Sequence, residues 1–228
     1  MSRRLSGALG IVLALPFSFA VLQADSKDEE TLNKANAVLQ EMLGKADFAP
    51  NLGKAKCILV LPEVKKFGIG IGGSGGRGPM SCRQGRNFEG TWSAPALYSV
   101  GGVSAGLQIG GSSTDFVLLV MNQKGVDALL KGKTKLGSDA TATAGSSGAT
   151  ASSVGSDILT YGKASGLFAG VSLGNATIEP DANGNKRLYG RQITVSEILA
   201  GKAVQSPPAG EPLISSLNTK IPRHTATK

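Results

Sequence analysis

The glycine-rich segment 68–78 (GIGIGGSGGRG) comes closest to a chemical motif in this sequence. Two overlapping windows within it match Gly-x-Gly-x-x-Gly, the string that cradles a pyrophosphate in dinucleotide-binding proteins. That string works only where a helix follows and directs its N-terminus at the phosphates. Here the residues Gly76-Arg77-Gly78-Pro79 follow, and no helix can begin cleanly among them. The segment therefore does not predict a nucleotide site.

The remaining reactive side chains do not combine into a catalytic or metal-binding set. His224 is the only histidine, and it lies near the C-terminus, where a Ser-His-Asp triad cannot be held in place. Two cysteines and one distant histidine cannot supply the four ligands of a zinc site. The candidate carboxylates stand singly at expected strand or turn edges; they are Asp115, Asp139, Asp157 and Asp181. We expect no enzyme activity, no metal and no cofactor.

Cys57 and Cys82 are the only thiols, and they fall on two neighbouring predicted strands. In an oxidising compartment two such residues favour a disulfide. The alternative is a pair of buried, small, apolar side chains. Composition and spacing leave both open.

Residues 26–121 predict a long helix, a second short helix that could begin at Pro50, and then a run of strands. Ser26-Lys27-Asp28-Glu29 has the form of a capping box, and apolar residues then recur at helical spacing as far as Leu43. From Cys57 to Met121 the chain is β-branched, apolar and punctuated by glycine, which is typical of short antiparallel strands. The 32 glycines among 228 residues, about twice the usual share, fit a sheet with tight turns.

The rest of the chain completes a single predicted domain. A helix is expected after Asn122, and residues 138–156 are either a flexible loop or closely packed strands of small residues. Strands resume over 158–161 and 166–178, and a capping box at Thr194 opens a last short helix. We expect an α+β fold over residues 25–201, with a strongly curved, mostly antiparallel, barrel-like sheet and peripheral helices. Residues 202–228 are predicted to be a flexible tail.

Residues 1–24 have the pattern of a secretory signal peptide. Arg3 and Arg4 precede an apolar run over residues 5–22, and an acidic stretch begins at Asp25. Cleavage after Ala20 or Ala24 fits the small residues there, and an uncleaved anchor is the alternative. The chain is expected to be exported, into the periplasm or the medium, where it could associate with a membrane.

The charge is too low to predict nucleic-acid binding. The formal net charge of the chain is +8, and loss of Arg3 and Arg4 with the signal would lower it to +6. Half of that charge of +6 lies in the predicted tail, residues 202–228. Basic residues also do not alternate with aromatic ones as they do in proteins that stack bases.

Seven segments, in order and spacing, resemble the SYLF domain family, also known as the Ysc actin-binding domain. They are 55–62 (AKCILVLP), 68–78, 92–95 (WSAP), 104–110 (SAGLQIG), 136–139 (LGSD), 165–173 (SGLFAGVSL) and 188–190 (LYG). The similarity covers about residues 30–201. It implies a lipid-binding module, since eukaryotic members bind phosphoinositides, partly through an amphipathic N-terminal helix, and some bind or bundle actin. Bacterial members are exported proteins with suspected lipid binding.

This sequence departs from the phosphoinositide pattern at that N-terminal helix. Residues 25–47 hold six acidic side chains and three lysines, a balance poorly suited to an anionic membrane. Actin does not fit as a partner for an exported, apparently bacterial protein. We expect a phospholipid or membrane surface as the partner, and the alternative is a structural protein of the envelope that binds another protein.

The lipid hypothesis places the ligand against the glycine-rich strands. Lys65, Lys66 and Arg77 would form a basic rim that accepts a phosphate. An apolar lining would accept acyl chains; its residues are Ile69, Ile71, Leu107, Ile109, Leu167 and Phe168.

Overall fold

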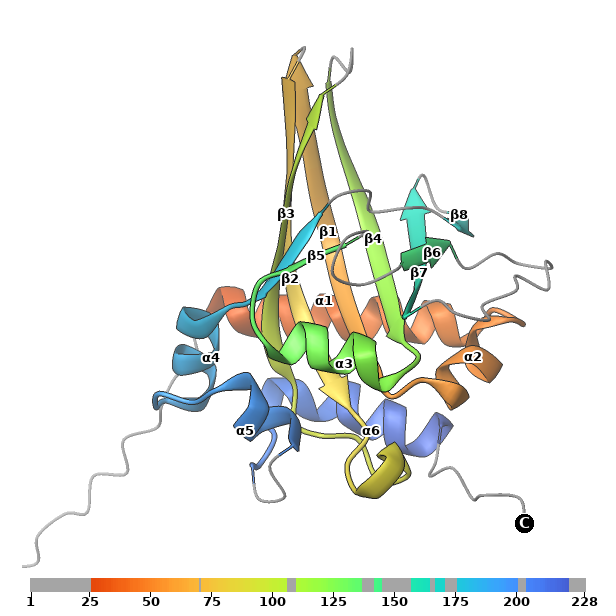
Figure 1. Cartoon of the computed structure of the whole chain (residues 1–228), viewed down its shortest axis with the longest axis vertical. Coiled ribbons are helices and arrows are strands. Elements are labelled where there is room, and N and C mark those ends of the chain that lie inside the picture. Colours follow the sequence, from red (N-terminus) through yellow and green to blue (C-terminus); the bar gives the residue numbers. More distant parts are fainter. Residues whose placement is uncertain are drawn as a thin grey trace, which may run out of the picture.

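The computed structural model describes residues 26–69, 71–105, 110–136, 142–144, 157–164, 167–170, 176–200 and 204–221. One curved sheet dominates these residues (Figure 1). Its strands are β1 (Cys57–Ile69), β2 (Ile71–Cys82), β3 (Ala96–Ala105), β4 (Gly110–Val120), β5 (Thr134–Lys135), β6 (Ala142–Ala144), β7 (Ile158–Ala164), β8 (Leu167–Gly170) and β9 (Thr177–Pro180). They lie in the order β5-β9-β3-β2-β1-β4-β7-β6, with β8 also paired to β7. Every pair is antiparallel except β6 with β7.

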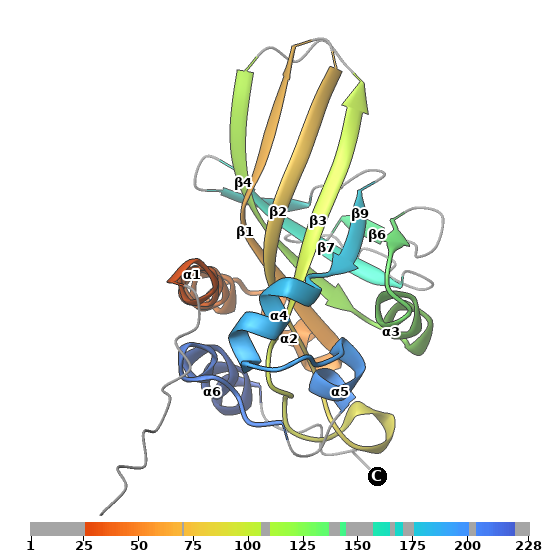
Figure 2. The same ribbon diagram turned by 90° about the vertical axis from the view of Figure 1, so that its left-hand side faces the viewer.

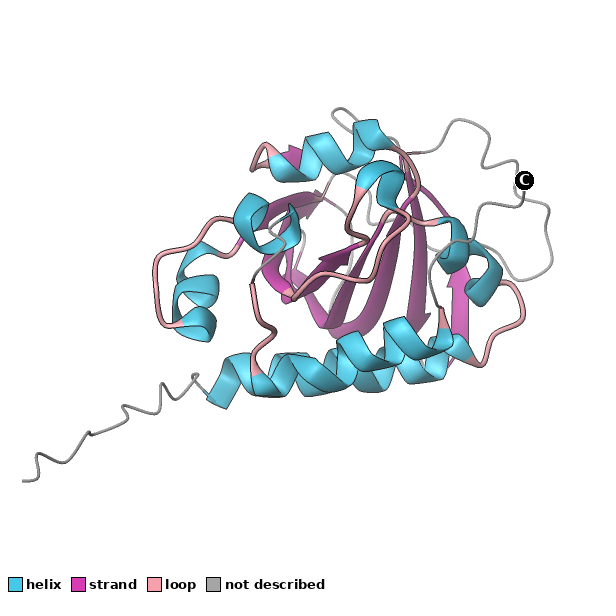
Figure 3. Cartoon of the chain, turned by 90° about the horizontal axis from the view of Figure 1, so that it is seen from below, coloured by secondary structure: helices cyan, strands magenta, loops and turns pink. Residues whose placement is uncertain are grey.

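Six α-helices cover the lower part of the sheet (Figures 1 and 3). They are α1 (Ser26–Leu43), α2 (Phe48–Lys54), α3 (Gln123–Leu130), α4 (Ala182–Tyr189), α5 (Val195–Ala200) and α6 (Glu211–Lys220). The predicted α+β fold with a curved, mostly antiparallel sheet and peripheral helices is therefore confirmed, as is the helix over 26–43. No helix of the described residues is long and apolar enough to cross a membrane.

Strand β1 separates two apolar clusters because its side chains alternate between the faces of the sheet. Ile58 and Val60 pack with α1, α2 and α6 on one face. Cys57, Leu59 and Leu61 pack with α3 and α5 on the other. Since both faces of this strand are covered, its sequence is a continuous apolar run rather than an alternating one.

A bulge interrupts β1 just below the glycine-rich half of the sheet. The pairing of β1 with β4 shifts by one residue between Leu61 and Val64. Glu63 takes a positive φ of 50° there, and its backbone N–H donates to the Asp115 carboxylate at 2.9 Å. The bulge projects the Glu63 side chain toward α1, where it pairs with Lys34.

The C-terminal segment contradicts the prediction of a flexible tail from residue 202 onward. Residues 211–220 form α6, which packs beside α1 (Figure 2). Leu213, Ile214 and Leu217 are buried, and the Asn218 side chain accepts a hydrogen bond from the Trp92 backbone N–H at 3.0 Å. The apolar spacing in this segment is short and follows a proline-rich stretch, so it did not stand out in the sequence. The domain therefore extends beyond residue 201.

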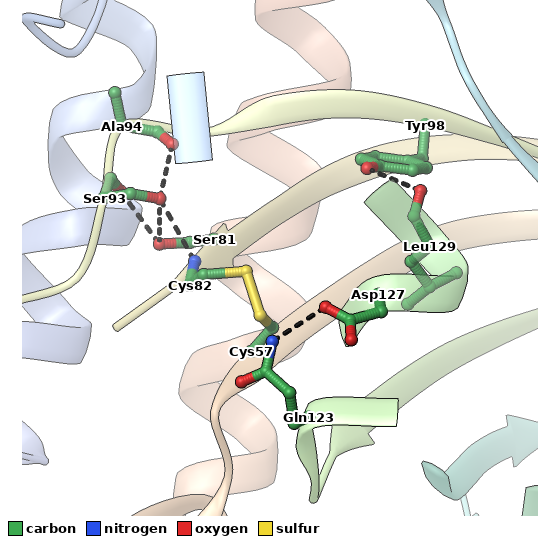
Figure 4. Close-up of a disulfide and its surroundings, with 9 residues drawn as sticks. All are labelled: Cys57, Ser81, Cys82, Ser93, Ala94, Tyr98, Gln123, Asp127 and Leu129. Atoms are coloured by element: carbon green, nitrogen blue, oxygen red, sulfur yellow. Dashed lines mark hydrogen bonds between the residues drawn. A yellow bond between two sulfur atoms is a disulfide. The ribbon is translucent and has the colours of Figure 1, made fainter. Parts of the chain in front are cut away.

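Cys57 and Cys82 form a disulfide that ties the start of β1 to the end of β2 (Figure 4). The two residues are register partners in the β1–β2 pair, and both are buried. Side chains of α3 lie beside the bond in the figure. Of the two alternatives that the sequence left open, the structure has the disulfide.

Candidate functional site

Lys65 and Arg77, two of the three predicted rim residues, line one surface pocket of about 440 Å³. The pocket lies between α1, the β1 bulge and the middle of β2. Lys66, the third predicted residue, follows Lys65 in the strand and therefore faces the opposite side of the sheet. Its ammonium lies 5.6 Å from the centre of the Phe116 ring. The structure thus brings Lys65 and Arg77 together and places Lys66 on the other face of the sheet.

Both signs of charge are present around the pocket. Its charged residues are Lys27, Lys34, Lys65, Arg77, Glu30 and Glu63. Lys34 pairs with Glu30 at 2.7 Å and with Glu63 at 2.9 Å, and these two carboxylates raise the pKa of Lys34 above its usual value. The hydrogen bond from Lys34 lowers the pKa of Glu30. The entrance is a set of exposed ion pairs, so its net field is weak.

A buried carboxylate holds the base of this pocket in place. Asp28, in the first turn of α1, is fully buried and pairs with Arg77 of β2 and with Arg187 of α4. Arg187 donates from Nε at 2.8 Å and from Nη2 at 3.1 Å. Arg77 also pairs with Asp181, the N-cap of α4, at 2.8 Å. We call Asp28, Arg77, Asp181 and Arg187 the buried ion network.

The six predicted apolar site residues are not shown to form one lining. Ile69 and Ile71 are register partners at the far end of β1 and β2. Leu167 and Phe168 lie in β8, which pairs with β7, so that β4 and β7 stand between them and β1. Leu107 and Ile109 fall outside the described residues. The shared acyl-chain surface therefore stays a prediction.

Phe67 is a surface feature that the site prediction missed. Its side chain is 65% exposed, and it is the single large apolar residue exposed to this degree among those described. It lies on the same face of β1 as Lys65, two positions further on. Its ring packs on Gly73, where an added Cβ would come within 3.1 Å of it. A lone aromatic residue within a glycine-rich run was the available signal.

The pocket and Phe67 together offer a ligand both charged groups and an exposed aromatic ring. The cations can attract carboxylates or phosphates, and the ring offers an apolar anchor. In the described part of the chain no three His, Cys, Asp or Glu side chains gather as a metal site would require. Lys34 is paired with Glu30 and Glu63, and the pairs of Arg77 with Asp28 and Asp181 connect β2 to the first turn of α1 and to the N-cap of α4.

Comparison with known proteins identifies relatives across most of the chain. A family model described as "Las17-binding protein actin regulator" matches residues 101–220, which end at the end of α6. Protein YSC84 of Saccharomyces cerevisiae is 34% identical over 93% of this chain and 46% of its own length. LAS seventeen-binding protein 3 of the same yeast is 32% identical over 74% of this chain and 38% of its own length. An SH3 domain-containing protein of Schizosaccharomyces pombe is 36% identical over 72% of this chain and 39% of its own length.

These findings correct the predicted partners. The sequence led us to expect a phospholipid or membrane surface and to set actin aside. One of these relatives is instead named for binding Las17, and the family model is described as a Las17-binding actin regulator, which points to proteins of the actin pathway. The expectation failed because it weighed the apparent export signal above the similarity of the folded part.

The sequence segments, the family model and the relatives all indicate the same family. The family model covers the chain from within β3 to the end of α6, and the relatives are 32 to 36% identical to this chain. This chain spans less than half the length of these relatives. The chain therefore belongs to the Ysc84 (SYLF) family.

Proposed function

We propose that this chain is a non-catalytic, protein-binding domain that regulates actin assembly. The observation that carries the proposal is the match to the actin-regulator family over residues 101–220, together with a relative named for Las17 binding. The geometry supports a binding role, because a disulfide-tied sheet and the buried ion network hold the exposed surface in one arrangement. A preformed surface loses little conformational entropy when a partner binds.

Co-sedimentation with purified actin filaments tests the proposal directly. We expect the purified chain to pellet with filaments in a saturable manner and to alter the time course of actin polymerisation. A parallel binding measurement with purified Las17 covers the second partner named by the relatives. If the chain bound neither protein and instead pelleted with phospholipid vesicles, the proposed function would be wrong.

Export is a separate proposal, and it is based on the sequence of residues 1–24 alone. Those residues lie outside the described structure. The binding proposal concerns the folded domain and does not depend on where the chain is delivered.

A further inference from the structure

Strand β4 has an open edge in its glycine-rich half. On its inner side, β4 pairs with β1 from Gly110 to Val120. On its outer side, pairing with β7 runs only from Asp115 to Val120. Among the described residues no strand pairs with the outer side of 110–114, and Figures 1 and 2 show this part of β4 rising beyond β7 and β8. We call residues 110–114 the β4 edge.

The backbone groups that point outward from the β4 edge can be assigned from its continuation. The Met121 N–H donates to the Asp157 carbonyl on the β7 side. Along β4, the N–H and C=O groups of successive residues point alternately toward β7 and toward β1. The bulge that shifts the register lies in β1, so the alternation along β4 is unbroken. Gly111 and Ser113 therefore direct their N–H and C=O groups toward the open side.

Among the described residues, the β4 edge lacks the features that usually protect a strand edge. Natural proteins block such edges with lysine, proline, a bulge or a covering segment. Here Gly111, Ser112 and Ser113 are exposed, and the edge contains neither lysine nor proline. On the opposite side of the sheet, the pairing of β3 with β9 ends at Gly101, and Ala176 lies beside Gly102.

The strand next to the β4 edge indicates which partner would fit. Phe67 is the register partner of Gly111, Lys66 of Ser112 and Lys65 of Ser113. An added strand would thus have a cation near it on each face of the sheet. The Phe67 ring rests on Gly73 of β2, on the side of β1 away from β4, and is not within reach of that strand. Pairing of two copies edge to edge would bring the lysines together, and like charges oppose each other there. An acidic segment is complementary.

We propose that the β4 edge binds an extended segment of a partner protein as an additional strand of the sheet. The segment carries carboxylates on the faces of the sheet where Lys65 and Lys66 lie. Main-chain hydrogen bonds to Gly111 and Ser113 supply affinity, and the side chains supply specificity. This inference names a site for the proposed function and rests on it in taking the ligand to be a protein.

Selection from a displayed library of random twelve-residue peptides tests this site directly. We expect the enriched peptides to contain acidic residues, to lack proline in the middle and to shift the amide resonances of Gly111 and Ser113. Failure to enrich any peptide, or enrichment of basic or proline-rich ones, would overturn the inference.

Two substitutions at one position separate the backbone from the side chain. Ser113→Pro removes the outward N–H and leaves the β1 side of the strand intact, so the selected peptide should bind about tenfold more weakly. Ser113→Ala keeps the N–H and should bind as the unchanged protein does. Equal affinity for Ser113→Pro, with its fold verified by circular dichroism, would contradict an added strand.

Side-chain recognition is tested by Lys66→Glu, which is expected to weaken peptide binding about tenfold. Lys133→Glu, far from this edge, is the matched charge control. The same variants in actin co-sedimentation separate the two proposals. If the unchanged protein fails to bind actin and Las17, the proposed function fails. If it binds and Ser113→Pro binds equally well, only the β4 edge is wrong.

Discussion

Replacing Asp28 by alanine should destabilise the domain far more than any other single change at an acidic residue of α1. The Asp28 carboxylate is fully buried and joins three elements that are distant in sequence, through Arg77 of β2 and Arg187 of α4. Removing one member of a buried ion pair costs about 3–5 kcal/mol, because the partner charge is left unmatched in a poorly solvated place.

The structure places the Asp28→Ala cost toward the lower end of that range. Arg77 keeps a second carboxylate, since its Nη2 lies 2.8 Å from Asp181. The side chain of Arg187 is 40% exposed and can be hydrated once Asp28 is gone. We expect a loss of about 3 kcal/mol in the free energy of unfolding. That is a large part of the roughly 5–15 kcal/mol typical of a domain.

Urea unfolding followed by circular dichroism measures this loss, and Glu30→Ala is the matched control. Glu30 lies in the same turn of α1, but its pair with Lys34 is exposed on both sides, so its removal should change the stability far less than Asp28→Ala does. A double-mutant cycle with Arg187→Ala should show coupling of the two residues. If Asp28→Ala were no more destabilising than Glu30→Ala, the buried ion network would not hold α1 to the sheet.

Three further predictions concern the disulfide, a buried tyrosine and export. The Cys57–Cys82 disulfide joins residues 25 positions apart in the sequence. Its loss in a Cys57→Ala/Cys82→Ala variant should lower the free energy of unfolding, measured in urea, by about 3.5 kcal/mol. An unchanged midpoint of urea unfolding would contradict this. Burial raises the pKa of Tyr98, so the stability it contributes is complete below the pKa of an unfolded tyrosine and falls as the pH rises above it. Tyr98→Phe should remove that part of the alkaline decline in stability. The export proposal predicts that N-terminal sequencing of the protein, expressed with residues 1–24 present, gives residue 21 or 25 as the first residue, and an intact Met1 would exclude cleavage.

The sequence alone was sufficient for elements whose pattern is local. The helical spacing from Leu32 to Leu43 and the apolar run from Cys57 to Leu61 each reflect burial against a neighbouring layer, and that burial imposes a period that can be read in one segment. Seven spaced segments were also enough to identify the family. The same reasoning missed α4 and α6, which are short and have few buried positions.

The candidate surface depended on contacts between residues far apart in sequence. Lys65 and Arg77 line one pocket, but their neighbours across it come from α1, and Arg77 is held by Asp28 and Asp181. No local pattern encodes such a meeting, because it depends on how the helices dock on the sheet.

The β4 edge likewise exists only in the folded sheet. Residues 110–114 have an ordinary turn-like composition of glycine, serine and threonine. They become an open edge because β7 stops pairing at Asp115 and because β1 places Lys65 and Lys66 alongside. The sequence determined the family, the strands and the long first helix through short-range periodicity. Which strand remained unpaired, and which charges surround it, was decided by long-range pairing, since strand order is a property of the whole sheet.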